Sequence, residues 1–170
     1  LKKKVLSADY LQADETPIKV LDKDKKGTTH RGYHWVYHAP NERLVLFDYR
    51  QGRGREGPNE ILKDFKGYLQ ADGYAVYEDF DNKPGITLLN CMAHARRKFD
   101  EAKDNDLAKA EYALTEIQKI YAIERNAKTD ELSVAQRYQL RQEKSVPALH
   151  DLKRWMLENY KSVLPKSTIG

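Results

Sequence analysis

A single cysteine, Cys91, occurs among the 170 residues, which excludes an internal disulfide. No apolar run approaches the roughly 20 residues that a membrane-spanning helix requires. The chain opens Leu1-Lys2-Lys3-Lys4, with neither an initiator methionine nor the pattern of a signal peptide. A glycine-rich phosphate loop, a serine-nucleophile motif and an internal repeat are also missing. We therefore expect a fragment of a longer cytoplasmic protein without a membrane partner.

Neither sign of charge dominates the composition. The 30 lysines and arginines exceed the 26 aspartates and glutamates enough to give a formal net charge of +4. This mild basicity permits a polyanionic partner such as DNA, and is equally typical of solvated helical surfaces. The length allows one sizeable core with a smaller appended subdomain.

Period-two alternation and turn signals predict β-strands in the first half of the chain. The expected strands lie around 11–20, 31–38, 43–49, 68–72 and 86–91, with turns at 22–27 and 40–42. The first three would form an antiparallel meander, because short connections join antiparallel neighbours. A helix opened by Pro58 and ended by Gly67, with Ile61, Leu62 and Phe65 inward, would follow the flexible stretch 51–57. It would return the chain parallel to an earlier strand.

Two aspartates stand within or at the end of predicted strands. Asp14 lies in Ala13-Asp14-Glu15-Thr16-Pro17, and Asp72 ends an apolar run before Gly73. Aspartate is depleted in strands and costly to bury unpaired, so both positions need a reason. If the two strands are neighbours, their carboxylates converge and need a counter-charge, which Mg²⁺ supplies. The alternative is that both aspartates are turn or capping residues.

Basic residues supply candidates for contacts with DNA phosphates. Arg53 and Arg55 lie in the glycine-rich stretch, where the backbone can approach a ligand closely. Arg96, Arg97 and Lys98 make the start of a later helix strongly basic. For both groups the alternative is ordinary solvated surface charge.

The spacing of Cys91 and His94 is that of half a zinc site. A structural zinc site needs four protein ligands, and the chain has no second cysteine. A packed thiol and a hydrogen-bonded histidine at a strand-to-helix corner is the favoured interpretation.

Long helices are predicted from Glu101 onward. The predicted seam of the first long helix is Leu107, Ala110, Leu114, Ile117 and Tyr121. Ser133-Val134-Ala135-Gln136 has the form of a capping box, and Pro147 would open the last helix. The inward residues of that last helix would be Leu149, Leu152, Met156, Tyr160 and Val163.

Three segments closely resemble the core of the insertion sequence 66 family of bacterial transposases: 13–17, 67–74 and 91–99, in this order. The segments 32–37 and 47–50 also fit. The resemblance implies an α/β, ribonuclease H-like fold of the DDE type, with a mixed five-stranded sheet. It implies a partial catalytic core over residues 1–100 and a helical insertion over 101–170.

The same resemblance implies a function. Asp14 and Asp72 match the first two acids of a site that holds two Mg²⁺ or Mn²⁺ ions, with His94 beside it. Such a protein cleaves and joins DNA strands at transposon ends and target, by two-metal phosphodiester transfer, and is expected to act as a homo-oligomer.

The third acid of such a site has no match in this chain. The resembled family places its glutamate after the helical insertion, in a segment with paired asparagines followed by Glu-Arg. Glu101, Glu111 and Glu158 lack that context, so we expect the 170-residue chain to be inactive alone. Two other hypotheses stay open: a ribonuclease H-like nuclease or resolvase without strand transfer, and a non-catalytic nucleic-acid-binding module.

Overall fold

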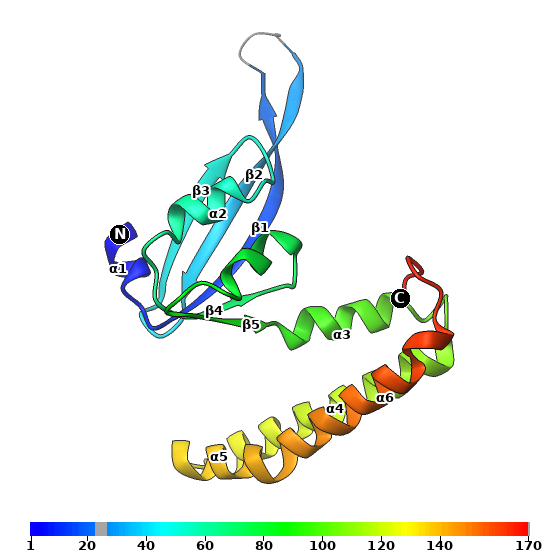
Figure 1. Cartoon of the computed structure of the whole chain (residues 1–170). Helices are drawn as coiled ribbons and strands as arrows, with labels where there is room; N and C mark the ends of the chain where they lie inside the picture. The colour runs from blue at the N-terminus through cyan, green and yellow to red at the C-terminus, as the bar shows by residue number, and fades with distance from the viewer. Residues whose placement is uncertain (23–26, 170) are drawn as a thin grey trace. The chain divides into compact units, whose positions relative to one another are not determined.

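A five-stranded sheet forms the first half of the protein, and the computed structural model describes residues 1–22 and 27–169 (Figure 1). Its strands are β1 (Tyr10–Leu21), β2 (Thr29–Ala39), β3 (Leu44–Arg50), β4 (Gly67–Ala71) and β5 (Ile86–Asn90). The spatial order is β3-β2-β1-β4-β5; β1, β2 and β3 pair antiparallel, and β4 is parallel to β1 and β5. The predicted α/β class and mixed five-stranded sheet are confirmed. Of the predicted turn at 22–27, residues 23–26 lie outside the described part.

Short helices connect and flank the strands. They are α1 (Lys2–Leu6), α2 (Glu56–Ile61) and a 3₁₀ helix, η1 (Ala75–Phe80). The prediction for α2 was partly wrong: the helix starts two residues before Pro58 and ends at Ile61. A Cβ at Gly57 would lie 3.3 Å from Arg50 Cγ, so glycine avoids a tight contact between α2 and the last residue of β3. Leu62 and Phe65 are buried as expected, in the turn after α2.

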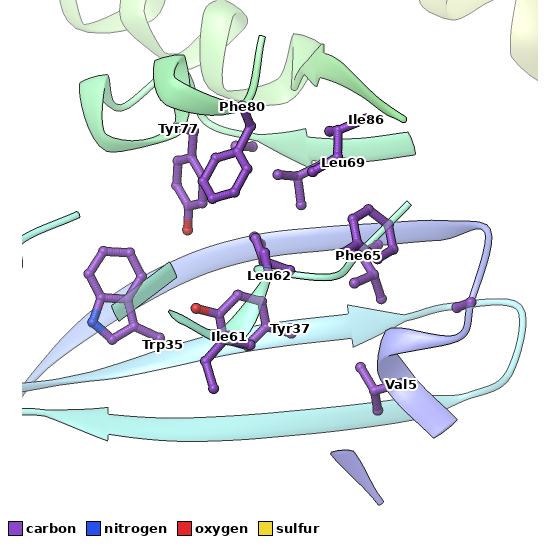
Figure 2. Packing of buried hydrophobic residues seen from close by; sticks show 14 of the residues in the cluster. Val5, Trp35, Tyr37, Ile61, Leu62, Phe65, Leu69, Tyr77, Phe80 and Ile86 are labelled. Carbon is purple, nitrogen blue, oxygen red and sulfur yellow. The ribbon is translucent and has the colours of Figure 1, made fainter. Parts of the chain in front are cut away.

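The hydrophobic core lies on one face of the sheet (Figure 2). Alternate residues of β1, β2 and β4 point into it, as the period of a strand requires. Its largest fully buried side chains are Trp35, Tyr37, Tyr77, Phe65, Phe80, Leu11, Leu62 and Leu69. Trp35 and Tyr77 meet edge to face with ring centroids 6.2 Å apart, which joins β2 to η1.

The chain divides into two compact units, Leu1–Cys91 and Met92–Gly170. The second unit consists of α3 (Met92–Glu101), α4 (Leu107–Thr129), α5 (Val134–Leu140), a π-helical turn η2 (Arg141–Ser145), α6 (Val146–Asn159) and η3 (Tyr160–Ser162). Helix α3 therefore belongs to the same compact unit as the later helices. The predicted boundary between a catalytic core and a helical insertion after residue 100 stays a prediction. In the described ranges, no helix is long and apolar enough to cross a bilayer.

Helix α4 was predicted correctly in type and partly wrongly in its buried face. Ala110 and Ile117 are buried, but Leu107 is 55% exposed. Ala113 and Ile120 are buried instead of the predicted Leu114 and Tyr121. The buried stripe consists of Ala110, Ala113, Ile117, Ile120 and Ala127, so it combines small residues, which let neighbouring helices approach closely, with two isoleucines.

Helix α6 runs back along α4 and buries only a narrow strip (Figure 1). Of the residues predicted to point inward, Leu152 is buried, while Leu149, Met156 and Tyr160 are exposed. Trp155 makes the main contact instead, by stacking on Tyr112 of α4 with ring centroids 4.4 Å apart. The inward prediction for α6 was therefore mostly wrong, because a pair of helices covers less surface than a complete bundle.

Two predicted local signals of the second unit are confirmed. Ser133 and Gln136 form the capping box at the start of α5. Pro147 lies in the first turn of α6 and has no N–H to donate to the carbonyl four residues earlier. The chain therefore passes from α5 into α6 through the π-helical turn η2.

An ion-pair network ties α4 to the end of α5. Glu124 accepts hydrogen bonds from Arg141 Nε at 2.6 Å and Nη2 at 2.8 Å, and Arg137 lies 3.2 Å away. The bond from Arg141 is the largest cause that lowers the pKa of Glu124 from its ordinary value of 4.5. The pair therefore stabilises the protein above the unfolded carboxyl pKa, and this contribution is lost as pH falls through the lowered folded value.

Changing Glu124 to glutamine is expected to destabilise the helical unit by about 1 kcal/mol at neutral pH, since the pair is bidentate yet partly exposed. The difference from the parent chain should vanish in acid, where both chains lack the carboxylate charge. Thermal melts followed by circular dichroism at neutral and acidic pH measure this. Glu111→Gln, at an exposed position of the same helix, is the control, and an equal loss in both variants would contradict the prediction.

Candidate functional site

The pairing of β1 with β4 brings the two predicted acidic strands together. The parallel register aligns Tyr10 with Tyr68 and Gln12 with Gln70, and Gln12 Nε2 donates to Gln70 Oε1 at 3.0 Å. The pairing runs as far as Gln12 and Gln70, so Asp14 on β1 and Asp72, one residue past the end of β4, follow on strands about 4.8 Å apart. The predicted adjacency of the strands is confirmed. That the two carboxylates share an ion stays a prediction.

Asp14 lies on the face of the sheet opposite the hydrophobic core. Its neighbour Ala13 is buried in the core, so strand alternation turns Asp14 the other way, while Asp72 directly follows β4 and is half-buried. Asp14 Oδ1 accepts from the Glu15 backbone N–H at 2.8 Å, and Asp72 Oδ1 accepts from the Tyr74 N–H at 2.9 Å. These local bonds are those of turn and capping residues. A carboxylate has two oxygens, so the bonds are also compatible with a shared cation.

Glu15 was not singled out from the sequence, and it is the most buried carboxylate near these strands. Its side chain is 1% exposed, and its Oε1 accepts a hydrogen bond from Arg53 Nε at 2.6 Å. Burial is the main cause that raises the pKa of Glu15, and the negative charges of Asp72 and Asp14 act in the same direction. The three carboxylates therefore lie within electrostatic range of one another. The signal that could have revealed Glu15 is the strand period, since it shares the inward face of Leu11 and Ala13.

The two arginines of the glycine-rich stretch have different surroundings. Arg53 pairs with Glu15 and stacks over the ring of Tyr74, with its guanidinium carbon 4.0 Å from the ring centroid. Arg55 instead donates to the partly exposed Asp79 at 2.7 Å. The structure brings Arg53 to the acidic residues, while DNA contact by either arginine stays a prediction.

The basic helix start and His94 belong to the second unit. His94 is half-buried on α3, and Arg96, Arg97 and Lys98 are exposed on the same helix. Arg96 also lines an open hollow together with Lys103 and Lys119. A role for these residues at the aspartates, or in binding DNA, stays a prediction.

Over residues 1–22 and 27–169, no group of three or more histidine, cysteine, aspartate or glutamate side chains could hold a metal ion. This finding gives no support to the zinc interpretation of Cys91 and His94. Two aspartate carboxylates on adjacent strands supply hard oxygen ligands, which suit Mg²⁺ or Mn²⁺, but a third ligand from the described residues is lacking.

The sheet defines the class of protein. Three antiparallel strands followed by a crossover to a strand parallel to the first, in the order β3-β2-β1-β4-β5, form a ribonuclease H-like sheet. The family model described as "Transposase IS66 family" matches residues 1–170. The chain therefore belongs to the IS66 family of transposases.

Similar curated proteins come from Sinorhizobium fredii (strain NBRC 101917 / NGR234). The uncharacterized protein y4jD is 28% identical over 172 residues, covering 93% of this chain and 33% of its own length. The uncharacterized protein y4qI is 30% identical over 161 residues, covering 84% of this chain and 29% of its own length. The chain thus spans about a third of the length of the curated relatives it matches. No solved structure matches it.

Proposed function

We propose that this chain forms part of the catalytic core of a DNA transposase, in which Asp14 and Asp72 together bind a divalent cation. The observation that carries the proposal is the parallel pairing of β1 with β4, which makes the strand that holds Asp14 the neighbour of the strand that ends one residue before Asp72. Family membership supports DNA as the substrate. It also favours strand cleavage and joining over the nuclease or resolvase alternative.

The chain's own residues prepare the site in two ways. The backbone N–H groups of Glu15 and Tyr74 each hold one aspartate oxygen, which restricts the carboxylate rotamers. The sheet supplies the spacing, since neighbouring strands fix the distance between the carboxylates better than a loop would. When bound, the Mg²⁺ or Mn²⁺ ions would polarise phosphate oxygens and offset charge on the attacking and leaving oxygens.

A complete site needs a third acid, which we expect from a part of the longer protein beyond these 170 residues. The cytoplasm is the proposed location. A homo-oligomer remains an expectation, supported by exposed rings on the face of the sheet that carries Asp14. Phe47 is 62% and Tyr68 53% exposed, and apolar surface of this kind favours association.

Metal binding tests the proposal. Calorimetric titration of the 170-residue chain with Mn²⁺ should show weak binding that falls about tenfold or more in Asp14→Asn and in Asp72→Asn, because each loses a charged ligand. Asp64→Asn, at an exposed position before β4, should leave it unchanged. Equal Mn²⁺ affinity in all four proteins would overturn the proposal.

A further inference from the structure

Arg53 is fixed at three points although it lies in a glycine-rich loop. Its Nε donates to Glu15 Oε1 at 2.6 Å, and its Nη2 contacts the same oxygen. Its guanidinium carbon lies 4.0 Å from the centroid of the Tyr74 ring. The Tyr74 hydroxyl also donates to the Arg53 carbonyl oxygen at 3.2 Å. A long side chain that would otherwise sample many rotamers is therefore confined.

Glu15 can hold the Arg53 side chain in one geometry because the Glu15 side chain is itself buried. Its side chain is 1% exposed, and its second oxygen, Oε2, has no hydrogen-bond partner within the part of the chain that the structure describes. A surface glutamate could pair with an arginine in many geometries. A buried carboxylate has one position, so its partner is also held in one position.

The residues that fix Arg53 flank the two aspartates. Glu15 directly follows Asp14, and Tyr74 comes two residues after Asp72. The charge of Asp72 also acts on the Arg53 guanidinium. Arg53 is therefore a pre-oriented cation within electrostatic range of Asp72, the aspartate that follows β4.

We propose that Glu15 and Tyr74 are positioning residues that present Arg53 to a phosphate oxygen of DNA bound at the Asp14–Asp72 site. The Arg53 side chain is 45% exposed, and Glu15 contacts its Nε and Nη2. A planar guanidinium contacted at Nε and Nη2 turns Nη1 away from that carboxylate, toward a second ligand. Guanidinium matches phosphate geometry well, and stacking on an aromatic ring leaves the edge of the group available. This inference rests on the proposed function.

Arg55 is a useful comparison, because its carboxylate partner is partly exposed, whereas the partner of Arg53 is buried. It is 54% exposed, and its partner Asp79 is 34% exposed. Two partly exposed groups leave the guanidinium free to reorient, so Arg55 contributes general positive charge, whereas Arg53 contributes a fixed contact.

DNA affinity of the 170-residue chain tests the role of Arg53. The probe is a short fluorescein-labelled duplex with one nick, in Ca²⁺, read by anisotropy across a series of salt concentrations. Arg53→Ala should weaken binding roughly tenfold and make the slope of log affinity against log salt shallower by about 1. Arg53→Lys should recover little of the affinity, because a point charge does not replace the guanidinium fork.

Arg43→Asn is the matched control. It removes the same charge from the turn before β3, at the other end of that strand from Arg53, and asparagine tolerates the positive φ of 55° at this position. Binding by this variant should stay close to that of the parent chain. Equal affinities for Arg53→Ala and Arg43→Asn would overturn the proposal.

A double-mutant cycle tests the positioning role of Glu15. Removing a negative charge would by itself strengthen DNA binding, whereas loss of positioning weakens it. Glu15→Gln should weaken binding about threefold in the parent chain and cause no loss of binding in the Arg53→Ala background. Tyr74→Leu should behave in the same way. Tighter binding by Glu15→Gln, or an equal effect in both backgrounds, would overturn the positioning role.

The design separates this inference from the proposed function. Failure of the parent chain to bind the nicked duplex would overturn both. Binding that is weakened by Asp72→Asn but is indifferent to Arg53→Ala would overturn the inference alone.

Discussion

Changing Asp72 to asparagine, in a chain extended to the length of the curated relatives, is expected to lower Mn²⁺-dependent DNA nicking by about a thousandfold or more. Asparagine has nearly the same shape and can still accept the Tyr74 N–H bond that Asp72 accepts at 2.9 Å. The loss would therefore report the missing negative charge at the metal site rather than a change of fold. Asp14→Asn should have an effect of the same size, because both residues hold the same ion.

The assay compares supercoiled plasmid nicking by the extended chain, the two variants and Asp64→Asn. The last variant makes the same chemical change at an exposed position between α2 and β4 and should nick as the parent does. The 170-residue chain should show little activity, because it lacks the third acid. Equal nicking by the parent and by Asp72→Asn would contradict the assignment, and full activity of the short chain would contradict the expectation of a further acid.

Tyr77→Ala is expected to destabilise the first unit by roughly 3–5 kcal/mol, as removal of a buried aromatic side chain usually does. Tyr77 is 1% exposed and its ring lies 6.2 Å from Trp35 and 6.5 Å from Phe80, centroid to centroid, so its loss leaves a cavity between η1 and the sheet (Figure 2).

Tyr77→Phe removes only the hydroxyl, so it measures the contribution of the hydroxyl to stability separately from that of the ring. That hydroxyl is buried with no hydrogen-bond partner in the described residues, and burial is the main cause that raises its pKa. Deleting it should be neutral or mildly stabilising, because an unsatisfied buried polar group is lost. Urea unfolding of both variants measures the difference. A large loss in Tyr77→Phe would show that the hydroxyl has a bound partner, and a small loss in Tyr77→Ala would contradict the packing.

The fold of the first unit follows closely from its sequence pattern. The alternation within residues 31–38 predicted β2, because a strand with one buried side carries a strict period of two. The parallel return of β4 followed from a strand, helix, strand order, which allows little else.

The helical unit was less predictable, because several faces of a long helix satisfy the same period. Residue size does not say which stripe of α4 is covered, and Leu107 is exposed while Ala113 is buried. That choice depends on where α3 and α6 pack, which is a tertiary property. The start of α2 was also misplaced, because Pro58 marks it from local signals alone, whereas the helix begins at Glu56.

The site was predictable in its aspartates and not in its supporting residues. Aspartate is rare in strands, so Asp14 and Asp72 stand out in the sequence as candidate functional residues. Glu15 was not singled out, although the strand period marks it as inward, and its partner Arg53 comes from a loop 38 residues later in the chain. Contacts of such sequence separation depend on the tertiary fold.

The most direct test of the account is a crystal structure of the chain grown in Mn²⁺, with the ion located by its anomalous scattering. The account predicts a peak between Asp14 and Asp72, with an oxygen of each carboxylate about 2.0–2.2 Å from the ion and the two carboxylates no more than roughly 6 Å apart. Carboxylates separated by more than about 10 Å, well beyond the reach of one shared ion, or a peak held by other residues, would contradict it.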